Sequence, residues 1–94
     1  MLVRVVKMQF NNNFIAEFKI LFKAVNEKIA TFEGCRGVKL LQHETELNIF
    51  FTISNWENSR ALENYRNSEL FKTTWAKVKP NFSAKAEAWS LLEQ

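Results

Sequence analysis

The chain has 94 residues, of which 47% are hydrophobic and 24% charged, as expected for one globular domain spanning residues 1–94. Nine phenylalanines and three tryptophans argue against disorder. No apolar run approaches the roughly 20 residues of a membrane span, so no membrane association is expected. The net charge of +3 comes from interspersed residues of both signs, whereas nucleic-acid binders usually show a basic stripe or cluster, so no nucleic-acid partner is expected.

Residues 2–10 alternate in the manner of a strand, with Val6, Met8 and Phe10 on one face. One of the asparagines at residues 11–13 is then expected to cap a helix, because an Asn side chain accepts from the first free amides. The helix should run to about Thr31, since its apolar residues recur at spacings of three and four: Phe14, Phe18, Leu21, Phe22, Val25 and Ile29. Gly34, just beyond it, can adopt a positive φ.

Residues 38–54 predict a hairpin of two strands that reverses at residues 44–46. The first strand places Val38 and Leu40 on one face, and Leu41 and His43 on the other. The second strand has a clearly apolar row and a mixed row. We expect the apolar row to face the helices, so that Phe50, in the mixed row, faces away; the apolar row is Leu47, Ile49, Phe51 and Ile53.

The pattern from Ser54 to Glu57 is that of a capping box and predicts a helix from about Trp56 to Tyr65. Ser68 is expected to cap a further short helix, which Pro80 cannot continue. Residues 82–92 predict a last strand. Its alanines, Ala84, Ala86 and Ala88, would face the helices, and Trp89 and Leu91 would face away.

The order strand, helix, strand, strand, helices, strand predicts an α+β fold of the ferredoxin-like, split βαβ type, with a four-stranded antiparallel sheet and helices on one face. The other face would carry too many large apolar groups for a solvated surface. A second copy of the chain is the simplest cover, since most oligomers are symmetric homo-oligomers. The predicted homodimer interface comprises Leu41, His43, Phe50, Trp89 and Leu91.

No metal or cofactor site is predicted. Cys35 and His43 are the only residues of their kinds, whereas a structural zinc ion takes about four nitrogen or sulfur ligands. Gly34 and Gly37 are the only glycines, which excludes a glycine-rich phosphate loop. Cys35 is more typical of a small buried hydrophobe than of a reactive thiol, and His43 is expected to be structural. With one cysteine and no sign of a secretory signal in MLVRVV, we expect a cytoplasmic protein.

Four segments carry a resemblance to a known family: residues 32–35 (FEGC), 51–56 (FTISNW), 65–71 (YRNSELF) and 86–89 (AEAW). Over nearly its whole length the chain resembles the antibiotic biosynthesis monooxygenase (ABM) domains of the dimeric α+β barrel superfamily. The resemblance implies homodimers that pair sheet to sheet. It also implies several functions: some members are cofactor-independent oxygenases of polycyclic quinols, some degrade haem, and many have no known activity.

The haem-degrading branch of that family can be compared residue by residue. Its pattern of an aromatic residue, Asn-Ser and Phe is matched here by Tyr65, Asn67, Ser68 and Phe71. However, Trp75 stands where that branch has the iron-ligating histidine, and residues 2–10 lack the asparagine that the branch carries on its first strand. An indole offers only an N–H donor and cannot ligate iron. Haem degradation is therefore disfavoured.

Two functions stay open. The first is an oxygenase that acts without metal or flavin on a small aromatic or quinol, with Asn55, Trp56 and Tyr65 as catalytic candidates and Arg66 as a charge partner. The second is a non-catalytic dimeric module of the same fold that binds a small apolar ligand or nothing. The small alanines of the last strand predict a ligand pocket under the helices, unless Trp75 or Phe71 fills it. The expected pocket residues are Phe14, Phe18, Phe22, Phe51, Phe71, Trp75 and Ala86.

Overall fold

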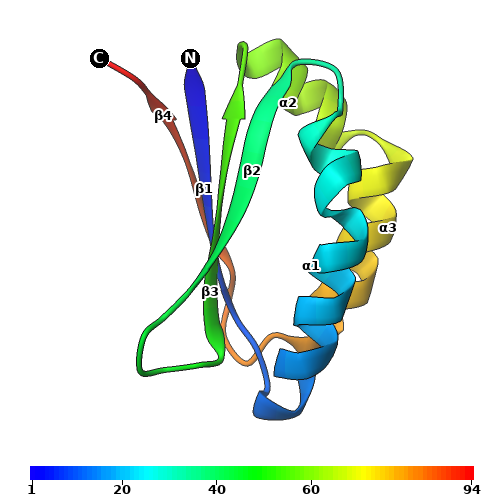
Figure 1. Cartoon of the computed structure of the whole chain (residues 1–94), viewed down its shortest axis with the longest axis vertical. Helices are drawn as coiled ribbons and strands as arrows, with labels where there is room; N and C mark the ends of the chain where they lie inside the picture. Colours follow the sequence, from blue (N-terminus) through cyan, green and yellow to red (C-terminus); the bar gives the residue numbers. More distant parts are fainter.

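The computed structural model describes all 94 residues and shows one sheet covered on one face by three helices (Figure 1). None of the helices combines the length and the apolar character that crossing a membrane requires. Short 3₁₀ turns occupy Asn12–Phe14 and Lys79–Asn81. The main elements are β1 (Leu2–Gln9), α1 (Ile15–Ala30), β2 (Cys35–Gln42), β3 (Ile49–Trp56), α2 (Ser59–Arg66), α3 (Glu69–Val78) and β4 (Glu87–Leu92).

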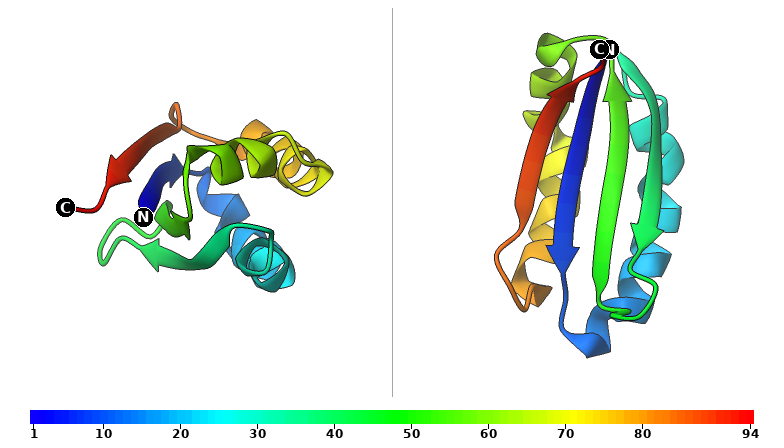
Figure 2. Two further views of the ribbon diagram at one scale, coloured as in Figure 1. Left: turned by 90° about the horizontal axis from the view of Figure 1, so that it is seen from above. Right: turned by 90° about the vertical axis from the view of Figure 1, so that its left-hand side faces the viewer.

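The four strands are antiparallel and lie in the order β2-β3-β1-β4, which confirms the predicted ferredoxin-like α+β fold. Figure 2 shows the sheet from its uncovered side, with the helices behind it. The first and last strands, β1 and β4, pair antiparallel with Leu2 opposite Leu92. The two ends of the chain therefore lie close together at one end of the sheet. All three helices lie on one face of the sheet, so no helix covers the other face.

The pairing of β1 with β3 decides which side chains meet under the helices. Met8 lies opposite Phe50, and Leu2 lies opposite Trp56; residues directly opposite in an antiparallel pair share a face. Phe50 is 1% exposed and packs with Met8 in the core. The predicted facing of the second hairpin strand is therefore wrong: Phe50 faces the helices, and Phe51, opposite Lys7, faces away. Alternation distinguishes two faces of a strand but cannot say which one the helices cover.

The core forms two clusters, one at each end of the sheet's covered face. The second cluster is smaller and lies where β1 begins and β3 ends; it contains Leu2, Trp56, Ala61 and Leu62. The first cluster is largely aromatic and includes the ring of Phe10 at 4.5 Å from the ring of Phe18. Its members are Met8, Phe10, Phe14, Phe18, Phe50 and Val78. The middle of the sheet thus lies between two packed ends.

The helix starts differ from the sequence-based expectations in two of three cases. No asparagine side chain caps the 3₁₀ turn that leads into α1. The capping box at Ser54 is wrong, because β3 continues to Trp56 and the Ser54 Oγ accepts from the Trp56 Nε1 at 2.9 Å. Asn58 caps α2 instead, accepting from the Ala61 amide. The cap at Ser68 is confirmed, since its Oγ accepts from the Phe71 amide at 3.2 Å.

The last strand is shorter than the expected 82–92. Only Glu87–Leu92 pairs continuously with β1, whereas Phe82 forms a single bridge with Phe10. Alanine is a poor strand former, and the chain before Glu87 is irregular. Ala88 nevertheless lies opposite Val6 on the covered face, and Trp89 lies opposite Val5 on the uncovered one, as predicted.

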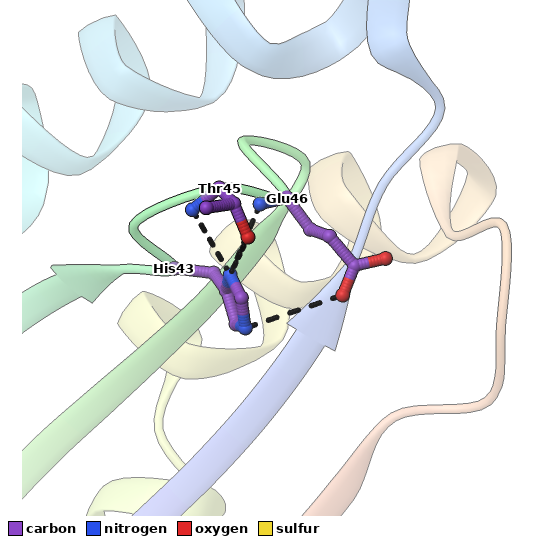
Figure 3. A network of polar contacts seen from close by, with 3 residues as sticks. All are labelled: His43, Thr45 and Glu46. Atoms are coloured by element: carbon purple, nitrogen blue, oxygen red, sulfur yellow. Dashed lines mark hydrogen bonds and ion pairs between the residues drawn. The ribbon is translucent and has the colours of Figure 1, made fainter.

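His43 holds the hairpin loop together. It lies just beyond the end of β2, so it is not a strand residue as predicted; its place in a dimer interface stays a prediction. Its Nδ1 accepts from the amides of Thr45 at 3.2 Å and Glu46 at 3.0 Å (Figure 3). Leu47, in the same loop, is 54% exposed and does not contribute to the core. His43 therefore stabilises the hairpin loop through local hydrogen bonds.

Gly34 fixes the distance between α2 and the start of β2. It has φ +86°, as expected, and its carbonyl accepts from the Glu57 amide at 2.9 Å. A Cβ built on Gly34 would overlap the Cβ of Ala61 on α2. The other glycine, Gly37, also has a positive φ, but a Cβ there would meet nothing.

These two glycines predict different effects of the same substitution. We expect Gly34→Ala to destabilise the chain more than Gly37→Ala, because it adds steric overlap to backbone strain of order 1–3 kcal/mol. Ala61→Gly should recover part of the loss in the double variant, although alone it weakens α2 by about 1 kcal/mol. Urea unfolding of the wild type, of Gly34→Ala, of Ala61→Gly and of the double variant forms a double-mutant cycle, and Gly37→Ala is measured beside it. Equal losses at both glycines, with no coupling to Ala61, would contradict the close approach.

Candidate functional site

A cavity of about 320 Å³ lies between the covered face of the sheet and the helices. Fifteen of its 21 lining residues are hydrophobic. Helix α1 contributes one wall, with Phe18, Leu21, Phe22, Val25 and Ile29; helices α2 and α3 contribute Leu62, Tyr65, Arg66, Phe71, Thr74, Trp75 and Val78; the sheet side contributes Arg4, Val6, Met8, Val38, Thr52, Ser54, Ala86, Glu87 and Ala88.

The cavity exists because the middle of the sheet carries small side chains. Along β3, Thr52 and Ser54 separate the bulky Phe50 and Trp56. At the edge of the sheet formed by β4, beyond β1, the side chains of Ala86 and Ala88 add little volume above the sheet. The packed clusters at both ends keep the helices at a distance that these small residues cannot bridge. The space is therefore a consequence of small side chains on β3 and at the β4 edge, and it does not require an opening of the fold.

Aromatic rings form one continuous wall of the cavity. Tyr65 contacts Phe71 edge-on, with ring centroids 5.3 Å apart, and Phe71 stacks on Trp75 at 5.7 Å. Trp75 in turn meets Phe82 at 5.5 Å. Such pairs stabilise one another and keep their rings in place. The row presents flat apolar surface to anything bound inside.

Of the eleven predicted catalytic and pocket residues, the structure brings seven together around the cavity; the exceptions are two pocket residues, Phe14 and Phe51, and two catalytic candidates, Trp56 and Asn55. Phe14 is buried in the first cluster, and Trp56 is buried in the second. Phe51 and Asn55 project from the uncovered face of β3, opposite Lys7 and Val3. These four do not line the cavity. Those that do are Phe18, Phe22, Tyr65, Arg66, Phe71, Trp75 and Ala86; their roles stay predictions.

The polar residues at one end of the cavity include two that sequence reasoning missed. Arg4 and Ser54 are direct partners across β1 and β3, and both line the cavity. Arg4 Nη1 donates to the Ser90 Oγ at 2.9 Å. Ser54 is 8% exposed and is the only buried polar residue. A signal was available for Arg4, because it shares the two-residue alternation of Val6 and Met8 and so must face the helices.

Burial perturbs three ionisable groups around this end. The pKa of Arg4 is lowered by desolvation and further by the charge of Arg66. Burial, with a smaller contribution from Cys35, raises the pKa of Tyr65 to about 12, so the phenol stays protonated and can only donate or accept as a neutral group. Burial also raises the pKa of the Cys35 thiol, which disfavours the reactive thiolate.

The arrangement offers little to a metal ion. No group of three or more His, Cys, Asp or Glu side chains is positioned to hold one. Trp75 lines the cavity with an indole, which cannot ligate iron, and the only histidine, His43, is engaged in the hairpin loop. The donor set is instead one of guanidinium, hydroxyl and phenol groups, which suits an organic ligand.

A sequence model of the family described as "Antibiotic biosynthesis monooxygenase" matches residues 1–77. The chain belongs to this family. The match covers β1 to most of α3, and hence most of the cavity's lining. Among curated proteins, none shows significant sequence similarity to this chain.

Solved structures share the fold of this ABM-family chain at low sequence identity. A crystal structure of an antibiotic biosynthesis monooxygenase superposes with a TM-score of 0.93 at 16% identity, covering 100% of this chain and 99% of the other. A conserved protein from Methanosarcina mazei Go1 gives 0.91 at 22% identity, covering 100% and 94%. Rv0793 from Mycobacterium tuberculosis gives 0.89 at 14% identity, covering 99% and 94%. At these identities the likeness establishes the fold alone.

Tyr65 is the only tyrosine of the chain, so its ionisation can be followed directly. We expect tyrosinate absorbance to appear with a midpoint of about 12 in the folded protein, compared with about 10 for a free tyrosine. Because the folded state keeps a proton that the unfolded state loses, stability should be fully present below pH ~10 and fall as pH rises toward 12. The absorbance change should be absent in Tyr65→Phe. A midpoint near 10 in the folded protein would mean that the phenol is solvated.

Proposed function

We propose that this ABM-family chain is a cofactor-independent monooxygenase that oxidises a small reduced aromatic or quinol bound in the cavity. The observation that carries the proposal is an apolar, aromatic-walled space with hydrogen-bond donors gathered at one end. Its volume is near the lower end of the roughly 300–1,000 Å³ of ligand pockets, which fits a compact aromatic ligand.

The proposed reaction needs no external reductant. In the keto tautomer of such a substrate, a ring carbon that carries two hydrogens becomes a carbonyl, one oxygen atom of O₂ enters the product, and the other leaves as water. The substrate supplies all four electrons. After deprotonation the substrate gives one electron to O₂, the two radicals join as a peroxide at that carbon, and the O–O bond breaks as water is released. The protein therefore has to orient the ring, exclude water and stabilise negative charge.

The lining residues suit these three tasks. The aromatic row of Tyr65, Phe71 and Trp75 offers flat surface against which a ring can stack. The α1 side chains that line the cavity are apolar, which favours a hydrocarbon ring over water there. The Tyr65 phenol, which stays protonated at neutral pH, can donate to an oxygen that gains negative charge during electron transfer.

A non-catalytic binding module is the second candidate, and one observation favours it. The only carboxylate lining the cavity belongs to Glu87, which pairs with Lys7 at 3.9 Å. No free base is thus held over the ring, and a catalyst would have to rely on a substrate acidic enough to ionise in a positive field. Oxygen uptake with a panel of quinols, without added flavin or metal, separates the two functions: no uptake above the uncatalysed rate with any quinol favours the module.

Ala86→Leu tests whether the cavity is the site of binding and turnover. Because Ala86 borders open space, the larger side chain should leave the melting temperature nearly unchanged while it blocks ligand binding and quinol-dependent oxygen uptake. Ala84→Leu is the matched control, since Ala84 is exposed and does not line this cavity. A loss of about 1–3 kcal/mol in stability without any effect on ligand would instead indicate an overpacked, closed core.

We also propose that the uncovered face of the sheet pairs with the same face of a second chain. Its strands carry Trp89, 43% exposed, and Leu41, 45% exposed, and no helix covers this side (Figure 2). Phe51 and Ile53 replace the predicted Phe50 on this face, which makes it more apolar than expected. Contiguous apolar surface of this kind marks interaction sites, and a stable interface buries roughly 1,600 Å² in total.

Trp89→Ala should weaken that dimer, because large aromatics dominate interface energies. Sedimentation velocity over a concentration series should show the dissociation shifted to higher concentrations in this variant. Ile20→Ala is the control: Ile20 is 71% exposed on α1, away from the sheet, and its removal should leave association unchanged. A wild-type chain that is monomeric at tens of micromolar would contradict the proposal.

A further inference from the structure

The donor-rich end of the cavity is chemically unlike the rest of its wall. Arg4 comes from β1, Arg66 from the last residue of α2, and Ser54 from β3. Together with the Tyr65 phenol, next to Arg66 on α2, they line one space from three different places in the sequence. A guanidinium group offers only donors, and the Ser54 hydroxyl already accepts from Trp56, which leaves its own proton free to donate.

The chain itself supplies too little negative charge to balance these donors. None of the four salt bridges involves Arg4, whose side chain donates to the neutral Ser90 hydroxyl. Arg66 has a partner in Glu63 at 3.7 Å, one turn back on its own helix and largely exposed. Glu87 is engaged by Lys7. The cavity end is therefore left with about one uncompensated positive charge, on Arg4.

That charge is held under unfavourable conditions. Arg4 is half-buried, and both desolvation and the nearby Arg66 disfavour its charged form. A buried cation normally has a paired anion, because removing a charge from water costs free energy that only a partner restores. Two guanidinium groups brought to the same end of an apolar cavity without a shared carboxylate form half of an ion pair, for which a ligand can supply the other half.

We infer that Arg4 and Arg66 form a carboxylate subsite, and that the ligand of this cavity is an aromatic monocarboxylic acid whose ring lies along the Tyr65–Phe71–Trp75 row. The inference rests on the proposed function and deepens it, since it names the class of substrate. Carboxylate is favoured because its two oxygens accept up to about four hydrogen bonds and match the planar fork of arginine. A single phenolate oxygen would leave several donors unused, and a dianion would exceed the one uncompensated charge.

The test compares three ligands of the same shape: 2-naphthoate, the neutral 2-naphthamide, and 2-naphthol, titrated calorimetrically into the full chain at pH 7. The wild type should bind the naphthoate at least about tenfold more tightly than the amide. In Arg4→Met this preference should fall by about tenfold to a hundredfold, the range expected for hydrogen bonds to charged groups. Affinity for the amide should stay the same, which shows that the cavity is intact.

Two further variants keep the inference testable if Arg4→Met does not fold. Arg66→Met changes an exposed residue at a helix end and should also reduce the preference for naphthoate. Arg60→Met is the matched control, since Arg60 is exposed on the same helix but does not line the cavity; it should bind all three ligands like the wild type. An equal effect of Arg60→Met would mean that net charge alone attracts the ligand and would overturn the subsite.

Other outcomes separate this inference from the proposed oxygenase. Equal binding of naphthoate and naphthamide, or binding of naphthol that rises only as its hydroxyl ionises, would overturn the carboxylate subsite even if quinols are oxidised. Arginine-dependent binding of naphthoate supports the subsite whether or not turnover occurs. Absence of oxygen uptake with reduced aromatic acids in that case would contradict the oxygenase alone.

Discussion

The register between β1 and β3 is the constraint on which the rest of this structure depends. It places Leu2 opposite Trp56 and Met8 opposite Phe50, so that bulky pairs close both ends of the covered face. Between them it places Arg4 opposite Ser54 and Val6 opposite Thr52. A shift by one residue would move every one of these side chains to the other face. The cavity and its polar end are thus properties of one strand pair.

The helices complete the site from the other side. Helix α1 packs its apolar stripe over β2 and the sheet centre, and α3 adds the Phe71–Trp75 pair. The close contact at Gly34 brings α2 onto the start of β2 and so places Tyr65 and Arg66 at the edge of the cavity. Residues far apart in the sequence therefore converge because each belongs to a rigid element, which is the arrangement that precise ligand positioning needs.

The two faces of the sheet have different proposed functions. The covered face borders a cavity that holds the unpaired charge of Arg4, whereas the uncovered face is mainly apolar and carries few charged groups, among them Lys7 and Lys39. The former suits a small anionic aromatic ligand, and the latter suits another protein surface. Because alternate residues of the same strands build both faces, a substitution on β3 or β4 acts on one face and leaves the other nearly unchanged. Such variants can therefore separate assembly from ligand binding.

The sequence by itself determined the element order, the amphipathic α1, the cap at Ser68 and the small Ala86 and Ala88 beside the cavity, whereas Ala84, predicted with them, is exposed and lies outside it. These are local patterns of spacing and size, which short stretches of chain encode without reference to the remainder. Only the tertiary structure decided which face of β3 is covered, that Asn55, Trp56, Phe14 and Phe51 lie outside the cavity, and that Arg4 joins Arg66. The reason is physical: β3 has apolar groups on both faces, and only its pairing with β1 selects the one that meets the helices.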